Sequence, residues 1–287
     1  MPIKIVLAKY NQLKYEFNQS ALSNNVVDTL KELYVLTRKF LLSLGRRTLL
    51  SQIPAKTYFS FDYGKKYSRA VNEKLYLNDD TLIDEFWKQL YQNSLHSISA
   101  AEITQACYTI AISFCCMIDL LKERDQKTPG TYYEYFIGCL FSRQFGIIPS
   151  SQLEVLNLDM KSKLPTDFIF DLGENNPKFH VPVKTSTRER VVQVWAHQRV
   201  LDGVYGTGRF LGLLSCLSET KLDHRTYQVI EICLPDQWRV YQLFIAQLKR
   251  IYYLDTPIRY EALNNIFPKI HVKSLGEFFH ETDDLSN

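Results

Sequence analysis

Two apolar runs separated by a turn constrain the fold of this chain most strongly. Residues 163–172 read Lys-Leu-Pro-Thr-Asp-Phe-Ile-Phe-Asp-Leu, and residues 178–186 read Lys-Phe-His-Val-Pro-Val-Lys-Thr-Ser. The five residues between them are Gly-Glu-Asn-Asn-Pro, a composition typical of the turn in a β-hairpin. In an antiparallel pair the start of one strand lies beside the end of the next, so the hairpin places Asp167 next to Lys184.

The rest of the chain predicts helices before this hairpin and mixed elements around it. Apolar residues recur at helical spacing over 26–41 and 82–91, and Ser99 and Glu102 have the spacing of a capping box. The helix that follows this box should run to about residue 121, and a charged loop ending in Pro-Gly should fill 122–130. Beyond it we expect helices at 131–144, 187–201 and 236–253 and strands at 167–172, 179–184, 209–216 and 227–234.

This order of elements predicts an α/β (α+β) fold. We expect residues 1–125 to be a mainly helical N-terminal region and residues 126–287 to form the core. The helical part should flank one integrated core rather than fold independently.

Composition and charge are those of a soluble globular protein. Hydrophobic residues make up 46% of the chain and charged residues 23%, enough apolar side chains for a sizeable core. The net charge of +3 permits a nucleic-acid partner without requiring one. The six cysteines lie mostly in apolar runs without zinc-site spacing, which indicates buried, reduced thiols in a cytosolic protein.

No part of the sequence predicts a membrane segment or a signal peptide. The longest apolar stretch, 106–118, is too short to span a bilayer and is typical of a buried helix. The first residues, Met-Pro-Ile-Lys-Ile, lack the layout of a signal peptide.

An aspartate beside a lysine suits phosphodiester hydrolysis. A carboxylate can hold Mg²⁺, which neutralises phosphate charge and lowers the pKa of a bound water. A nearby lysine can orient that water and stabilise the developing charge. Glu134 is our candidate for a second metal ligand, although its spacing from Thr131 also fits a capping box. Asp167 could instead be a turn residue, and Lys184 a solvated strand end.

These residues also resemble a known family. The segments Pro165-Thr166-Asp167, Val183-Lys184-Thr185-Ser186 and Arg188-Glu189-Arg190, with Gln193, resemble the active-site stretch of type II restriction endonucleases of the PD-(D/E)XK nuclease superfamily. The nearest likeness is to the group that reads sites with CC and GG ends. It covers about residues 131–201 and implies a restriction-endonuclease-like core, a central mixed sheet flanked by helices. It also implies Mg²⁺ as cofactor, with Asp167 as central ligand, Lys184 as catalytic lysine and Glu134 as helix carboxylate.

The resemblance assigns DNA reading to the segment after the lysine. Arg188 and Arg190 would donate to guanine, and Glu189 would accept from cytosine. Ser186 and Gln193 would also contact DNA. Independently, a helix N-terminus with hydroxyls and arginines favours phosphate or groove contacts. Glu189 has a second interpretation, a capping box with Ser186.

Two departures from the family pattern bear on the metal site. Pro182 replaces the usual acid two residues before the lysine, and His197 stands where the CC/GG-reading group has a compensating glutamate. Either Glu134 suffices, or His197 takes part, or the site is altered. His197 could also be an ordinary helix histidine.

The sequence therefore predicts a type II restriction endonuclease that cuts double-stranded DNA at a short site. A palindromic site implies a homodimer. The resemblance further implies a companion DNA methyltransferase and a prokaryotic cytoplasm. The rivals are a catalytically degenerate DNA-binding member of the fold, a repair or RNA nuclease, and a helical interaction protein.

Overall fold

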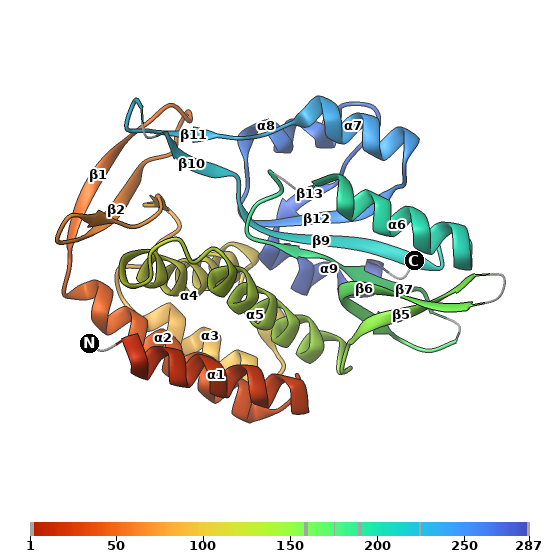
Figure 1. Ribbon diagram of the computed structural model, residues 1–287, viewed down its shortest axis with the longest axis horizontal. Helices are drawn as coiled ribbons and strands as arrows, with labels where there is room; N and C mark the ends of the chain where they lie inside the picture. The colour runs from red at the N-terminus through yellow and green to blue at the C-terminus, as the bar shows by residue number, and fades with distance from the viewer. Residues whose placement is uncertain (1–2, 158–159, 175, 189–190, 224, 286–287) are drawn as a thin grey trace.

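The computed structural model describes residues 3–157, 160–174, 176–188, 191–223 and 225–285. Its centre is a mixed sheet of seven strands (Figure 1). The order is β13-β12-β9-β7-β6-β5, and β8 also pairs with β9. The strands are β5 (Ser150–Asn157), β6 (Met160–Asp171), β7 (Lys178–Val181), β8 (Val183–Lys184), β9 (Phe210–Ser218), β12 (Leu248–Asp255) and β13 (Val272–Ser274).

Helices cover both faces of this sheet. Along β9, Leu213 and Leu217 belong to one hydrophobic cluster, with α4 (Ala100–Leu121) and α5 (Lys127–Phe145). The alternate residues Leu214 and Cys216 belong to another, with α6 (Val191–Tyr205) and α7 (Pro235–Phe244). Because successive strand side chains point to opposite faces, this alternation shows a sheet buried on both sides. The mixed sheet flanked by helices confirms the predicted fold class.

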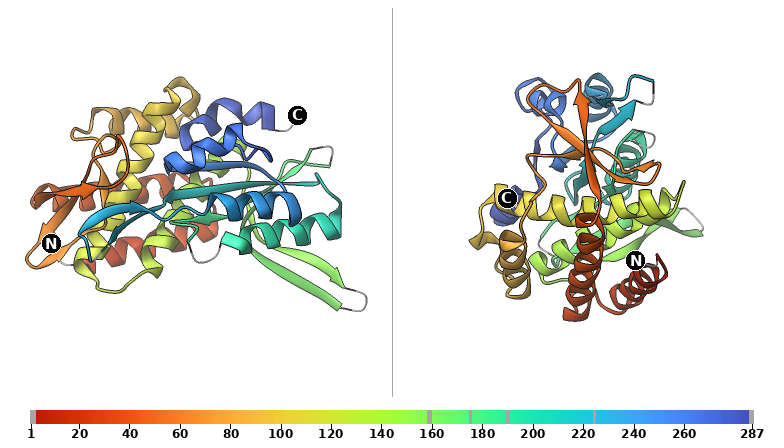
Figure 2. Two further views of the ribbon diagram at one scale, coloured as in Figure 1. Left: turned by 90° about the horizontal axis from the view of Figure 1, so that it is seen from above. Right: turned by 90° about the vertical axis from the view of Figure 1, so that its left-hand side faces the viewer.

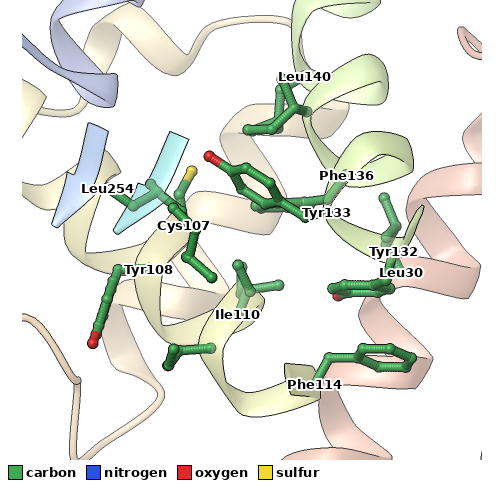
Figure 3. Packing of buried hydrophobic residues seen from close by; sticks show 14 of the residues in the cluster. Leu30, Cys107, Tyr108, Ile110, Phe114, Tyr132, Tyr133, Phe136, Leu140 and Leu254 are labelled. Atoms are coloured by element: carbon green, nitrogen blue, oxygen red, sulfur yellow. The ribbon is translucent and has the colours of Figure 1, made fainter. Parts of the chain in front are cut away.

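The N-terminal helices pack outside α4 and α5. They are α1 (Ile3–Gln19), α2 (Asn24–Leu42) and α3 (Thr81–Tyr91). Figure 3 shows Leu30 of α2 near the stacked rings of Phe114 and Tyr132, whose centroids are 3.9 Å apart. The same cluster reaches Leu254 on β12, so it joins elements on both sides of residue 125. The division of the chain at residue 125 stays a prediction.

Helix α4 is the buried helix that the apolar stretch predicts. The capping box of Ser99 and Glu102 is present. By length and composition α4 could cross a membrane, but 89% of its most apolar window is buried inside the protein, as in a core helix. All six cysteines are buried and free.

A smaller sheet was not predicted. It has the order β10-β11-β1-β2-β3, and β4 also pairs with β2. Its strands come from two distant parts of the chain, so no local sequence pattern predicts their pairing. They are β1 (Gly45–Ser51), β2 (Tyr58–Tyr63), β3 (Lys66–Tyr67), β4 (Val71–Asn72), β10 (Thr220–Asp223) and β11 (Gln228–Glu231).

The chain ends in short elements near β12. These are α8 (Ile258–Glu261), β13 and α9 (Phe278–Leu285), with single 3₁₀ turns between them. A further 3₁₀ turn precedes α4. Figure 2 shows the β5–β6 hairpin extending away from the rest of the molecule.

The helix predicted at 236–253 is correct to Phe244 and wrong beyond it. Helix α7 ends at Phe244, and Leu248–Asp255 forms strand β12, which lies between β9 and the edge strand β13. The side chain of Gln242 holds the turn between them, because it accepts from the N–H of Leu248 and donates to its carbonyl. Apolar helix and strand residues adjoin in the sequence without a glycine or proline, so periodicity alone merged them.

The predicted loop at 122–130 is also partly wrong, because α5 begins at Lys127. Asp125 accepts hydrogen bonds from the backbone N–H and the hydroxyl of Thr128. Pro129 lies in the first turn, where its missing N–H costs nothing. Glu134 therefore lies in the second turn, which excludes its role in a capping box with Thr131.

Candidate active site

The predicted hairpin is present and brings Asp167 to Lys184. Strands β6 and β7 are antiparallel, with Phe168 opposite Val181. The Nζ of Lys184 lies 2.6 Å from Oδ2 of Asp167, and the backbone N–H of Val183 donates to the same oxygen at 2.7 Å. Both side chains are about a quarter exposed. Asp167 is therefore held by strand backbone as well as by the lysine.

Pro182 explains how the two residues meet. If the β6–β7 register continued, Pro182 would lie opposite Asp167, but proline has no N–H to donate. The chain leaves β6 at this point, and Val183 and Lys184 pair with Ser215 and Cys216 of β9 as β8. The N–H of Val183 then reaches the Asp167 carboxylate. Pro182 cannot bind metal, but it ends one strand pairing where the site begins.

A pocket of about 260 Å³ opens beside the pair. It gathers four of the predicted catalytic and metal residues and one predicted DNA contact. Its lining consists of Glu134, Pro165, Thr166, Asp167, Pro182, Lys184, Gln193, Val194 and His197.

Glu134 enters the pocket from α5. The neighbouring Tyr133 is fully buried and hydrogen-bonds Ser215 of β9 at 3.1 Å, which fixes this part of the helix against the sheet. Burial raises the pKa of Glu134 to about 7, and the negative charge of Asp167 adds to this rise while Lys184 opposes it. Two neighbouring carboxylates repel each other when both are charged, so they form a suitable site for a cation.

The donor set fits Mg²⁺. This ion prefers oxygen ligands and is usually held by one or two carboxylates together with water and substrate phosphate. Both hydrogen bonds to Asp167 fall on Oδ2, so among the described residues Oδ1 has no partner. The hydroxyl of Thr166 is buried without a hydrogen-bond partner in the described structure and lies on a residue that lines the pocket. Thr166 belongs to the Pro165-Thr166-Asp167 segment, but the sequence alone predicted no role for its hydroxyl.

His197 and Gln193 lie on the pocket side of α6. Their side-chain nitrogens are 3.5 Å apart. Burial lowers the pKa of His197, and Lys184 lowers it further. Its ring centroid lies 6.4 Å from that of His180, a fully buried histidine on β7 that sequence analysis missed within an apolar run. His197 is thus placed at the pocket, and its role in catalysis stays a prediction.

The predicted DNA-reading segment begins beside the pocket. Arg188 is exposed, whereas Thr187 is buried. The hydroxyl of Ser186 donates to Glu219 and accepts from the N–H of Arg188, so it serves the turn itself. Its contact with DNA stays a prediction. Glu189 and Arg190 lie outside the described residues, so their predicted contacts and the alternative capping box stay untested.

The sequence matches no protein-family model and no curated protein. Among solved structures, the chain is similar to the type IIP restriction endonuclease Kpn2I, with a TM-score of 0.82 and 24% identity over 98% of this chain and 97% of that one. A restriction endonuclease PspGI–substrate DNA complex also matches, with a TM-score of 0.43 and 14% identity over 72% of this chain and 92% of that one. The first match shows that this chain has the fold of that type IIP restriction endonuclease, as the predicted resemblance implied.

The raised pKa of Glu134 predicts a pH-dependent cost to stability. The folded protein holds this proton more tightly than the unfolded chain, so the free energy of unfolding should fall as pH rises from about 4.5 to about 7. In EDTA at about pH 8, Glu134→Gln should raise Tm by roughly 2–4 °C, the effect of about 1 kcal/mol in a chain of this size. Near pH 4 the gain should vanish.

Thermal unfolding followed by circular dichroism measures this difference. Glu174→Gln, at an exposed turn position, is the matched control and should leave Tm unchanged at both pH values. A lower or unchanged Tm for Glu134→Gln at pH 8 would show that the Glu134 carboxylate is not under strain.

Proposed function

We propose that this protein is a type II restriction endonuclease that hydrolyses both strands of double-stranded DNA at a specific short site. The observation that carries the proposal is the Asp167–Lys184 ion pair, with Glu134 across the same pocket. The fold shared with the type IIP restriction endonuclease Kpn2I supports it. The cofactor would be Mg²⁺, and the products would carry 5′-phosphates.

Asp167 and Glu134 are the residues that would hold Mg²⁺. When bound, the ion supplies charge neutralisation at the phosphate and a water of lowered pKa. Within the described ranges, no three His, Cys, Asp or Glu side chains are grouped so as to hold a metal on their own. Water and the DNA phosphate would therefore complete the coordination, as is usual for this ion.

Lys184 has two tasks in this proposal. Its ammonium lies against Asp167 and faces the pocket, where it can orient the attacking water and stabilise charge on the phosphate oxygens. The lysine is on a strand paired to the centre of the sheet, so its backbone position is rigid. Such fixed placement matters because catalysis depends on geometry held before the substrate arrives.

The degenerate alternative is disfavoured by the geometry around Pro182. The missing acid at this position leaves the lysine–aspartate contact intact, because the N–H of Val183 takes the place of a continued strand pairing. Glu134 then supplies the second carboxylate from another element.

A second acid–lysine pair at the far end of the same hairpin provides a matched test. Asp171 lies opposite Lys178 and forms a more exposed ion pair with it. Lys184→Ala or Asp167→Asn should reduce Mg²⁺-dependent cleavage of plasmid DNA by at least about 100-fold. Lys178→Ala and Asp171→Asn should stay close to the native rate, and EDTA should abolish cleavage by every variant.

Initial rates on supercoiled plasmid, read by gel electrophoresis, measure these effects. Equal losses at both pairs would contradict the assignment of the active site. Specific DNA binding by a native protein that does not cut would favour the degenerate alternative.

We propose that the segment from Arg188 to Arg190 reads adjacent G·C pairs. Arg188 is exposed at the turn before α6, where a bidentate contact with guanine is sterically open. Arg188→Ala should lower discrimination between the cognate site and sites with one G·C pair replaced by about 10–100-fold, since such a contact is worth about 1–3 kcal/mol.

Arg199→Ala is the matched control, because Arg199 is also an exposed arginine but lies within α6, eight residues after its first residue, Val191. It should preserve discrimination in competition cleavage of duplex oligonucleotides. Unchanged discrimination in Arg188→Ala would remove Arg188 from base reading.

We also propose that the protein acts as a homodimer. The pocket holds a single Asp–Lys pair, whereas a duplex has two strands to cut, and a two-fold dimer would match a palindromic site. Sedimentation velocity of the native protein should give a mass twice that of the chain. A monomer that remains monomeric on its cognate duplex would contradict the dimer.

A nuclease of this kind needs host DNA protected at the same sequence. We therefore propose a companion DNA methyltransferase as a functional partner, and the cytoplasm of a prokaryotic cell as the place of action. Cleavage of plasmid that carries methylated sites, compared with unmethylated plasmid, tests this relation.

A further inference from the structure

Glu219 is a buried carboxylate that the proposed chemistry does not use. It directly follows β9 and is 1% exposed. Its Oε1 accepts from the backbone N–H of Thr187 at 2.8 Å, from the Thr187 hydroxyl at 2.6 Å and from the Tyr253 hydroxyl at 2.8 Å. Its Oε2 accepts from the hydroxyl of Ser186 at 2.8 Å.

Three of these four hydrogen bonds come from one turn. Residues 185–188 join Lys184, at the end of β8, to the segment that enters α6. The carbonyl of Thr185 also accepts from the N–H of Ser218 at 3.3 Å, so the turn is attached to the end of β9 at successive residues. The inner side of the turn is bound to Glu219, and Arg188 is exposed on the turn's outer part.

Stability alone is a poor reason to keep this carboxylate. Burial raises the pKa of Glu219, although the donors from Thr187, Ser186 and Tyr253 lower it. None of these four donors is a cation, and desolvating a carboxylate is costly even when it is fully hydrogen-bonded. The four hydrogen bonds to the two oxygens of Glu219 instead hold the turn in a single orientation.

We propose that Glu219 is a positioning residue for DNA recognition, which fixes the 185–188 turn so that Arg188 meets the bases in one orientation relative to Lys184. This inference rests on the proposed function. Glu219 would not touch DNA; it would act through the turn. Because Lys184 immediately precedes the turn, the same anchor would tie base reading to the position of the catalytic lysine.

Glu219→Gln is the direct test, since it keeps the size of the side chain and replaces one accepting oxygen with a donor group. In hydrogen exchange read by mass spectrometry, the N–H of Thr187 should exchange at least about tenfold faster without DNA present. Discrimination between the cognate site and single-base variants should fall by about tenfold or more, because a small displacement of a reading group is costly.

Asp255→Asn is the matched control for the loss of a buried carboxylate. Asp255 is 2% exposed at the end of β12, where it accepts from Lys56, Asn72 and Tyr58. We expect Asp255→Asn and Glu219→Gln both to lower Tm, but Asp255→Asn should leave both the exchange of Thr187 and the discrimination unchanged.

Two milder variants separate the turn from the rest of the network. Thr187→Val and Tyr253→Phe each remove one hydroxyl donor from Oε1, but only Thr187 belongs to the turn. We expect Thr187→Val to lower discrimination and Tyr253→Phe to preserve it. If Glu219→Gln does not fold, the difference in discrimination between Thr187→Val and Tyr253→Phe tests the proposal in its place.

Unchanged exchange in Glu219→Gln would overturn the anchor, and faster exchange with unchanged discrimination would overturn its role in recognition. A native protein that neither cuts nor selects a DNA site would contradict the proposed function instead, and this result is read from the native protein alone. Such a native protein would also overturn the role of the 185–188 turn in DNA recognition. The exchange rate of the Thr187 N–H would still show whether Glu219 holds the turn in place.

Discussion

The contact of Lys184 with Asp167 is the interaction on which the arrangement of the site depends. It requires the pairing of β7 with β6 to end at Pro182, while β8 continues in the same register the pairing with β9 that β7 already makes. The carboxylate then accepts from strand backbone and from the lysine at one oxygen. A pair made in this way is attached to the centre of the sheet rather than to a loop.

The packing of helices on the two faces of the sheet explains why Glu134 lies beside Asp167 and Lys184. Helix α5 lies in the cluster that covers one face, and Tyr133 hydrogen-bonds Ser215 from inside that cluster. Glu134 is the next residue, so the same packing that stabilises the helix directs a carboxylate toward Asp167. Burial and the charge of Asp167 raise the pKa of Glu134, so its charged form is disfavoured at this position. The opposite face carries α6, which brings His197 and Gln193 to the same pocket.

Local patterns were enough to predict the hairpin, the helices at 24–42, 81–91 and 100–121, and the meeting of Asp167 with Lys184. Each of these follows from a turn, a cap or a periodic apolar stripe within a short window. The strand β12 was missed because Gln242 separates it from α7 by tertiary hydrogen bonds rather than by a breaker residue. The small sheet pairs β1 with β11 across most of the chain, and Glu219 becomes meaningful only when β9 lies beside the turn at 185–188. Long-range contacts of this kind leave no periodic signal.

Sequencing the ends of the fragments produced from phage DNA in Mg²⁺ tests the central claim most directly. A site-specific endonuclease centred on Asp167 and Lys184 predicts that every end falls at one short sequence, that both strands are cut there, and that each end carries a 5′-phosphate. Ends scattered over unrelated sequences, or no ends above those of an EDTA control, would contradict it.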